Sequence, residues 1–334
     1  MEKESQRNKE FDERMMRRAI EIARSASGLA SPNPMVGAVI VSPDGIIVGE
    51  GFTSAWGGAH AEVNAVNSVR DKSILSQCDI YVTLEPCSHH GKTPPCAAML
   101  AHHKFRRCVV GIADPFAKVA GRGLKCMRDA GIEVEVGVLE TECRELNRRF
   151  ITAHTHGRVY VILKWAQSAD GFVAHADGSP ANLSDAVGRV LVHRERSKVD
   201  AILVGSQTVI NDNPQLDCRF WPNRLLRPVI LDARNRIGDG ANVNREETIF
   251  VRQPMTPQEI ARMLYDREGL ISLMVEGGPT TLGAWIESGV FDEVRVEISP
   301  VVLGEGLKAP TLPELPYTYS RQGSSVIAHW QRRV

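Results

Sequence analysis

The chain has 334 residues, 43% of them hydrophobic and 24% charged, which is enough for two globular domains of ordinary size. Its 40 basic and 40 acidic residues give a formal net charge of zero, which argues against a protein whose main work is to hold a nucleic-acid backbone. No apolar run is long enough to span a membrane, and the polar start of the chain does not resemble a secretory signal. Seven cysteines without the dense spacing of a disulfide scaffold favour a reducing, cytoplasmic location.

The first part of the chain alternates between helical and strand-like patterns. Apolar residues at helical spacing predict a helix over 11–27, and apolar runs on either side of Pro43-Asp44-Gly45 predict a β-hairpin. This alternation is typical of a layered α/β domain. Further helices are expected over 60–69, 95–102 and 124–130, and further strands over 79–84, 108–112 and 133–136.

A charged stretch at 141–158 carries little strand signal, and the strand–helix pattern restarts after it. We place the domain boundary in this stretch, with a first domain at 1–148 and a second at 149–334. In the second domain, strands are expected over 160–165, 201–204, 228–231, 248–251, 272–275 and 293–298.

Soft metal ligands gather in two short stretches of the first domain. His60, Cys87 and Cys96 would fill three corners of a zinc tetrahedron and leave the fourth for water, as catalytic zinc requires. A turn between the two cysteines would bring Cys96 to a helix N-terminus, which favours a thiolate. Glu62 would take a proton from the water and deliver it to a leaving group. The set predicts hydrolytic deamination of a ring carbon.

Each of these residues also has a simpler interpretation when taken alone. A lone histidine is usually capped or solvated, and two cysteines can be small buried hydrophobes. The combination and its order favour zinc. His60-Ala61-Glu62 and Pro86-Cys87 match parts of the zinc base-deaminase signature, although eight residues, not two, separate the cysteines.

The inserted loop SHHGKTPP, the run SPNPMVGAVIV at 31–41 and the stretch 113–134 resemble the bifunctional riboflavin-biosynthesis deaminase/reductase family. The resemblance covers almost the whole chain. It implies a cytidine-deaminase-like three-layer domain followed by a dihydrofolate-reductase-like α/β domain, with one zinc ion per chain and NADPH as cofactors. The implied reactions are deamination of a phosphoribosylamino-pyrimidine and reduction of its ribosyl group to ribityl.

The second domain has no GxGxxG, so an ordinary Rossmann site is not indicated. The turns at 203–214 and 274–286 follow strands and are candidate phosphate cradles, or simply turns. The family pattern implies that the cofactor is bound by Ala166, Asn182, Thr208, Asp212, Gly278, Pro279, Thr280, Thr281, Leu282, Gly283 and Ala284. It implies that the substrate is bound by Arg196, Leu216, Arg219 and Glu276. Asn182 departs from the family, because many members carry a tryptophan at this position.

Further residues are hypotheses only. Lys92 and Thr93 would hold a substrate phosphate, or belong to a solvated loop. Asn33 would contact the pyrimidine edge, or only stabilise its turn. His89 and His90 are expected to be substrate contacts or surface residues and not zinc ligands.

Two other functions compete with a two-step enzyme that acts on a small molecule. A deaminase of nucleic acid or free nucleosides is disfavoured by the balanced charge. A structural zinc protein would leave Glu62 without a role. We expect neither nucleic acid nor membrane as a partner, and a homo-oligomer only by analogy with other metabolic enzymes.

Overall fold

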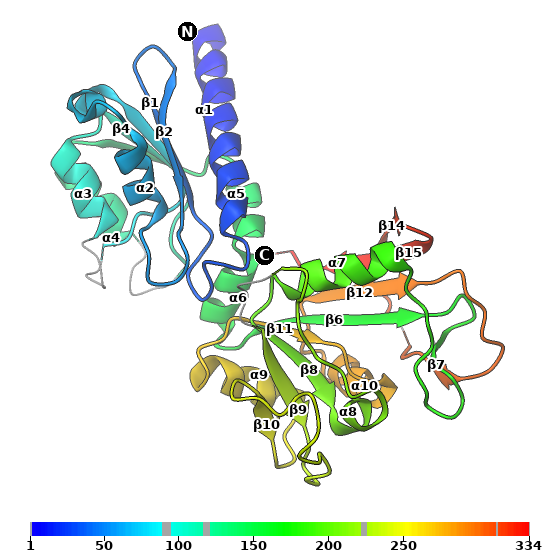
Figure 1. The fold of residues 1–334 in the computed structure, drawn as a ribbon. Helices are drawn as coiled ribbons and strands as arrows, with labels where there is room; N and C mark the ends of the chain where they lie inside the picture. Colours follow the sequence, from blue (N-terminus) through cyan, green and yellow to red (C-terminus); the bar gives the residue numbers. More distant parts are fainter. Residues whose placement is uncertain (1, 89–94, 116–120, 222–225, 312, 334) are drawn as a thin grey trace. The chain divides into compact units, whose positions relative to one another are not determined.

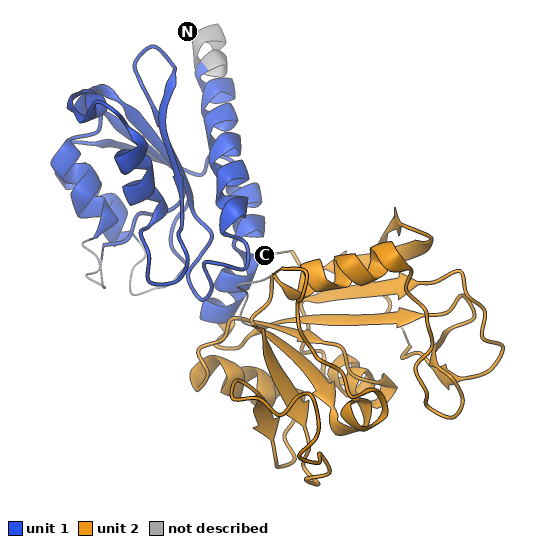
Figure 2. Cartoon of the chain, viewed as in Figure 1, with its two compact units in different colours: residues 1–155, 334 blue, residues 156–333 orange. Residues whose placement is uncertain are grey.

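The computed structural model describes residues 2–88, 95–115, 121–221, 226–311 and 313–333, with the backbone alone for residues 2–7. The chain forms two compact units, residues 1–155 and residues 156–333 (Figure 2). We describe each unit by itself. Among the described residues, no helix combines the length and the apolar composition that crossing a bilayer requires.

The first unit is built on a five-stranded sheet with the order β2-β1-β3-β4-β5 (Figure 1). The strands β2, β1 and β3 pair antiparallel, whereas β3, β4 and β5 are parallel. The strands are β1 (Gly37–Val41), β2 (Ile47–Phe52), β3 (Asp79–Leu84), β4 (Arg107–Ile112) and β5 (Glu133–Val136). The helices are α1 (Glu2–Ala23), η1 (Arg24–Ala26), α2 (Ala61–Ser68), η2 (Lys72–Gln77), α3 (Cys96–His103), α4 (Arg122–Asp129), α5 (Glu140–Leu146) and α6 (Arg148–His156).

Small residues let helices lie directly on this sheet. A Cβ at Gly51 of β2 would come within 2.3 Å of the Ala65 backbone nitrogen, so α2 lies against β2 at backbone distance. On β1, a Cβ at Gly37 would lie 1.9 Å from the Ala19 carbonyl oxygen of α1. Helices thus cover both faces, with α2, α3 and α4 on one face and α1 on the other (Figure 1). The N-terminus of α2 is held beside the sheet by this packing.

The second unit has an eight-stranded sheet with the order β10-β9-β8-β11-β6-β12-β15-β14. The strands from β10 to β12 are parallel, and β15 and β14 extend the sheet antiparallel. The strands are β6 (Tyr160–Gln167), β8 (Ala201–Gly205), β9 (Arg227–Leu231), β10 (Ile249–Val251), β11 (Ser272–Val275), β12 (Glu293–Ile298), β14 (Thr318–Gln322) and β15 (Ser325–Gln331), with a small pair formed by β7 (Phe172–Ala174) and β13 (Leu307–Lys308). The helices are α7 (Ala186–Arg196), α8 (Ser206–Asp212), α9 (Pro257–Asp266) and α10 (Pro279–Ser288).

The parallel part of this sheet brings distant turns together. Because β6, β11 and β8 are neighbours and parallel, the segments that follow them meet at one edge of the sheet. The two candidate cradles follow β8 and β11. A Cβ at Gly205 would lie 2.9 Å from Thr281 Oγ1, so these two turns are in direct contact.

All predicted strands are present, and the helices predicted in the first domain are also present, with ends shifted by a few residues. The predicted helix over 11–27 begins further upstream, at Glu2, and its last part is the 3₁₀ turn η1. The C-terminal hairpin of β14 and β15 was not predicted. β14 is the edge strand of the sheet and is largely exposed, so its sequence lacks the apolar run of a buried strand.

Candidate active sites in the two units

His60, Cys87 and Cys96 are brought together in the first unit, and the metal-ligating atoms of all three lie within 4.8 Å of one another. His60 is the N-cap residue of α2, Cys87 follows β3, and Cys96 is the first residue of α3. The His60 Nδ1 atom lies 3.5 Å from Cys87 Sγ and 3.4 Å from Cys96 Sγ.

These distances fit zinc. A tetrahedral ion with ordinary Zn–N and Zn–S bonds sets its nitrogen and sulfur ligands about 3.5 Å apart. The donor set of one imidazole and two thiols is also one that zinc prefers over harder cations. No other group of described His, Cys, Asp and Glu residues forms such a cluster.

The two cysteines differ in their protonation without a metal. The Cys87 sulfur accepts hydrogen bonds from the Cys96 thiol and from the Cys96 backbone N–H at 3.3 Å, and the pKa of Cys87 is lowered to about 4. The same contact raises the pKa of Cys96, with burial adding to the effect. The helix N-terminus was expected to favour a thiolate at Cys96, the first residue of α3, but the pKa is lowered at Cys87, which accepts from the Cys96 N–H, and raised at Cys96.

Glu62 lies on the first turn of α2 and is only 3% exposed. Its carboxyl group is in hydrogen-bonding contact with the Cys96 side chain. Burial raises the pKa of Glu62 to about 7, and the nearby Cys87 thiolate adds to the rise. A carboxyl group with this pKa can both accept and donate a proton near neutral pH.

The structure shows less about the other residues predicted for this site. Lys92, Thr93, His89 and His90 lie outside the described residues. Asn33 is half-buried, and its backbone N–H donates to the Ala30 carbonyl in a turn.

Asn147, which sequence reasoning missed, fixes the end of the SPNPM segment. Its side chain accepts from the Met35 N–H at 2.8 Å and donates to the Met35 carbonyl at 3.0 Å. Asn147 is buried between α5 and α6, in the charged stretch where the sequence placed the domain boundary. The only signal in the sequence was an uncharged amide among charged neighbours.

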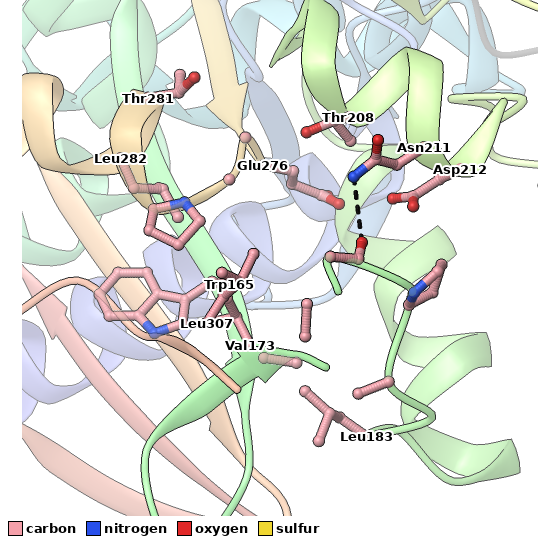
Figure 3. Close-up of a pocket in the computed structure, with 18 of the residues that line it drawn as sticks. Trp165, Val173, Leu183, Thr208, Asn211, Asp212, Glu276, Thr281, Leu282 and Leu307 are labelled. Carbon is pink, nitrogen blue, oxygen red and sulfur yellow. Dashed lines mark hydrogen bonds between the residues drawn. The ribbon is translucent and has the colours of Figure 1, made fainter. Parts of the chain in front are cut away.

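The second unit contains a pocket of about 540 Å³ at the carboxyl edge of its parallel strands. This volume lies within the range of about 300–1,000 Å³ that is typical of ligand pockets. Thr208, Asn211 and Asp212 of α8 line one side, and Trp165, Val173 and Leu183 approach from below in the view of Figure 3. The Asn211 side chain donates to the Gly178 carbonyl at 3.1 Å and joins two parts of the wall (Figure 3).

Most of the residues predicted to bind the cofactor line this pocket. The N-cap of α10 is Gly278, which has no side chain to cap the helix, so backbone N–H groups remain for an anion. Asn182 lines the pocket and accepts from Arg189 Nη1 at 3.2 Å. Gly283 and Ala284 are further along α10 and are not among the lining residues. The predicted residues that do line it are Ala166, Asn182, Thr208, Asp212, Gly278, Pro279, Thr280, Thr281 and Leu282.

The residues predicted to bind the substrate gather next to the pocket. Glu276 follows β11 and lines the pocket, and it is paired with Arg196 of α7. Asp217 connects Arg196 with Arg219. Its carbonyl accepts from Arg196 Nη1 at 3.4 Å, and its carboxylate accepts from Arg219 Nε at 3.1 Å. Leu216 precedes it and is buried. Of these residues, only Glu276 lines the pocket itself.

Lys164 on β6, which lines the pocket beside Glu276, was not predicted from the sequence. It forms no hydrogen bond with a described residue. Burial lowers the pKa of Lys164, and the Glu276 carboxylate partly opposes that change. A lysine inside an otherwise apolar strand, YVILKWAQ, was the available signal.

The two units match two different known protein families. Residues 9–112 match the zinc-binding region of cytidine and deoxycytidylate deaminases, and residues 159–320 match the RibD C-terminal domain. The fold and the two sites therefore define a bifunctional enzyme, a zinc-dependent deaminase joined to a reductase.

Similar proteins extend over nearly the whole chain. The riboflavin biosynthesis protein RibD of Aquifex aeolicus is 38% identical over 324 residues, which cover 90% of each chain. RibD of Escherichia coli is 35% identical, with 91% of this chain and 92% of the other covered. A solved structure of Acinetobacter baumannii RibD has a TM-score of 0.89 at 30% identity and covers 96% of this chain and 99% of its own.

A solved Thermotoga maritima protein, described as a diaminohydroxyphosphoribosylaminopyrimidine deaminase/5-amino-6-(5-phosphoribosylamino)uracil reductase, has a TM-score of 0.87 at 34% identity. The match covers 97% of this chain and 99% of the Thermotoga maritima protein. The chain belongs to the RibD family of bifunctional riboflavin-biosynthesis enzymes. The expected cytidine-deaminase-like and dihydrofolate-reductase-like domains are confirmed, and the cofactors are zinc and NADPH.

Proposed function

We propose that the first unit deaminates 2,5-diamino-6-(5-phosphoribosylamino)pyrimidin-4(3H)-one and that the second reduces the product to 5-amino-6-(5-phosphoribitylamino)uracil. The observation that carries this proposal is the compact group of His60, Cys87 and Cys96 with the buried Glu62 carboxyl group beside it. The functional boundary would lie between residues 148 and 149, in the first turn of α6.

In the deaminase, His60, Cys87 and Cys96 hold zinc. When bound, zinc lowers the pKa of a coordinated water and supplies a nucleophile near neutral pH. Glu62 would take a proton from that water and pass it to the departing amine, which would leave as ammonia. Asn33 contacts the pyrimidine edge, and Lys92 binds the phosphate.

In the reductase, the glycine turn at the start of α10 and the side chains of α8 hold the cofactor. NADPH held there would supply the hydride that reduces the ribosylamine at C1′, reached as its open-chain imine. Arg196 uses its Nε and Nη2 atoms on Glu276, which supports a role in orienting that carboxylate. Arg219 is the more exposed of the two arginines, with 54% of its side chain accessible, and binds the phosphate together with the Leu216 segment.

Reduction of an imine also needs a proton on nitrogen. Lys164 is the proton donor that the pocket supports best, because its ammonium group lies beside Glu276 and has no hydrogen bond to a described residue. A Lys164→Met variant keeps the length of the side chain and removes the proton. We expect kcat for reduction to fall about 10²–10⁴-fold, the range for loss of a general acid, with a much smaller change in KM.

One experiment tests both reactions. Wild type, Glu62→Ala and Arg196→Ala are given the ribosylaminopyrimidine phosphate and NADPH, while ammonia release and NADPH loss are followed together. Wild type should do both, and Glu62→Ala neither until the deaminated intermediate is added. Arg196→Ala should release ammonia normally and consume NADPH slowly. Ammonia release without NADPH loss, even from added intermediate, would refute the reductase assignment.

The proposal extends to the cellular location, oligomeric state and partners of the protein. We propose that it works in the cytoplasm as a homo-oligomer, on a small molecule and not on nucleic acid or at a membrane. Light scattering of the purified full chain tests the oligomer. A salt-dependent mobility shift of RNA or DNA at low micromolar protein would contradict the exclusion of nucleic acid.

A further inference from the structure

Glu85 is a buried carboxylate that the proposed mechanism does not use. It lies between β3 and Cys87 and is 4% exposed. Its Oε2 atom accepts from the N–H groups of Asp114 at 3.1 Å and Gly121 at 3.0 Å. Its Oε1 atom accepts from the N–H groups of Gly123 at 2.9 Å and Leu124 at 3.4 Å.

Three of these donors belong to the N-terminus of α4. Gly121 is the N-cap residue and has no side chain, so the helix provides no cap of its own. Glu85 acts as this cap from a neighbouring strand end. The fourth donor, Asp114, follows β4, so a single carboxylate joins the ends of β3 and β4 to α4.

Cys87 accepts hydrogen bonds at the N-terminus of α3, as Glu85 does at the N-terminus of α4. Its sulfur accepts from the N–H of Cys96 at the N-terminus of α3, and its carbonyl accepts from the Ala97 N–H at 3.1 Å. The segment 85–87 thus places one hydrogen-bond acceptor side chain at each of two helix N-termini, with Pro86 between them. The Pro86 carbonyl oxygen would lie only 2.0 Å from a Cβ at Gly123, so the backbone of α4 is packed directly against this segment.

We propose that Glu85 is a positioning residue for the deaminase. By anchoring the segment 85–87 to α4, it holds Cys87 at the distance from His60 and Cys96 that the metal requires. This inference rests on the proposed role of these three residues as zinc ligands. Glu85 does not touch the metal or the substrate in this scheme; it acts through the backbone that carries Cys87.

A purely structural helix cap would behave differently. Loss of a cap costs stability, but it leaves the zinc environment of the folded enzyme unchanged. Loss of a residue that positions a ligand alters metal release and ligand geometry in protein that is still folded, typically by about 10–100-fold in metal affinity or activity. The test therefore needs readouts of the metal itself.

We would compare full-length Glu85→Gln, Glu85→Asp and Gly123→Ala with wild type. Glutamine replaces one accepting oxygen with a donor, which leaves buried N–H groups without a partner. In Gly123→Ala the carboxylate is kept, but the new Cβ pushes the Pro86 carbonyl away. Glu142→Gln, an exposed glutamate on α5, is the matched control. Reduction of added deaminated intermediate shows in each variant that the second unit is folded and active.

The measurements are the rate of zinc release to a chelator, the absorption spectrum of the cobalt-substituted enzyme, and kcat and KM for deamination. We expect Glu85→Gln and Gly123→Ala to release zinc about 10–100-fold faster, to change the cobalt spectrum and to lose deaminase kcat, with the reductase unaffected. Glu85→Asp, which keeps the carboxylate, should show smaller changes than Glu85→Gln in zinc release, cobalt spectrum and deaminase kcat. Glu142→Gln should match wild type in all three.

The proposal is overturned if Glu85→Gln and Gly123→Ala show wild-type zinc release and cobalt spectra, whatever happens to their melting temperatures. If Glu85→Gln does not fold, the same comparison is made with Gly123→Ala and Glu85→Asp. Wild-type protein that binds neither zinc nor cobalt would instead refute the zinc site itself, so the two failures are distinguishable.

Discussion

Arg196 on α7 and Glu276 after β11 form a two-pronged ion pair between residues far apart in the sequence. The Arg196 Nε and Nη2 atoms donate to the two Glu276 oxygens at 3.1 and 2.7 Å, and both side chains are largely buried, with 16% and 9% exposure. Such planar pairing uses the fork of the guanidinium group, which a lysine cannot reproduce. The pair fixes the orientation of a carboxylate that lines the reductase pocket.

Removing one partner of this pair should be costly. In Arg196→Ala, the Glu276 charge stays buried without its counter-ion, and we expect the unfolding free energy of the second unit to fall by about 3–5 kcal/mol. Arg196→Lys should fall between this variant and wild type, because it keeps the charge but loses the second hydrogen bond. Tryptophan fluorescence reports on the second unit, which contains the buried Trp165 and Trp285. Equal stability of Arg196→Ala and wild type would contradict the structural role.

The same pair predicts a dependence of stability on pH. Burial opposes ionisation of Glu276, but Arg196 and Lys164 outweigh it and lower the pKa of Glu276 from its usual 4.5 to about 2. The ionised form therefore stabilises the fold fully above pH 4.5, and this contribution is lost as the pH falls toward 2. It amounts to about 3 kcal/mol.

This dependence is measured against a double variant, Arg196→Ala with Glu276→Ala. Chemical denaturation at several values between about pH 6 and pH 3 should give a stability difference from wild type that narrows below about pH 4.5. A difference that stays constant over this range would show that Glu276 titrates normally.

Glu62 should be needed for deamination but not for metal binding. We expect Glu62→Gln to keep its zinc and to lose about 10²–10⁴-fold in deaminase kcat, because the amide cannot carry a proton between water and amine. NADPH consumption from added deaminated intermediate is the internal control. A Glu62→Gln enzyme that still releases ammonia at the wild-type rate would exclude Glu62 as the proton carrier.

The two cysteines should both be required for the metal. In Cys87→Ser and Cys96→Ser, a weak hydroxyl ligand replaces a thiolate, and the zinc content of purified protein should fall well below one ion per chain. Cys126, a half-buried cysteine of α4 outside the cluster, offers Cys126→Ser as the matched control with full zinc content. Retention of zinc in both site variants would refute the ligand assignment.

Two adjacent glycines should respond differently to alanine. A Cβ at Gly277 would come within 2.6 Å of Thr281 Cβ, so Gly277→Ala must displace the first turn of α10 and should cost about 1–3 kcal/mol. A Cβ at Gly278 would meet only Thr208 Oγ1, at 3.9 Å, so Gly278→Ala should fold normally. Both should raise KM for NADPH. Thermal unfolding and NADPH titration separate the two effects, and equal melting temperatures would contradict the packing argument.

The cluster of His60, Cys87 and Cys96 was predictable because each of its parts has a local signal. His60 and Glu62 are two residues apart, and the strand and helix that carry Cys87 and Cys96 have clear apolar patterns. The glycine turn before α10 was predictable for the same reason, since it directly follows the buried strand β11. Lys164 was visible as a charge in an apolar strand, but only the pocket gives it a role.

The sequence by itself determined the chemistry of this protein: the ligand types for zinc, the carboxyl group beside them, the two α/β domains and the family. Only the tertiary structure revealed the Arg196–Glu276 pair, the Asn147 clamp on Met35 and the four amides around Glu85. Their partners are far apart along the chain, and they meet because of strand order and helix packing. Local periodicity carries no information about either, since hydrogen bonds between distant segments depend on where the folded backbone brings them.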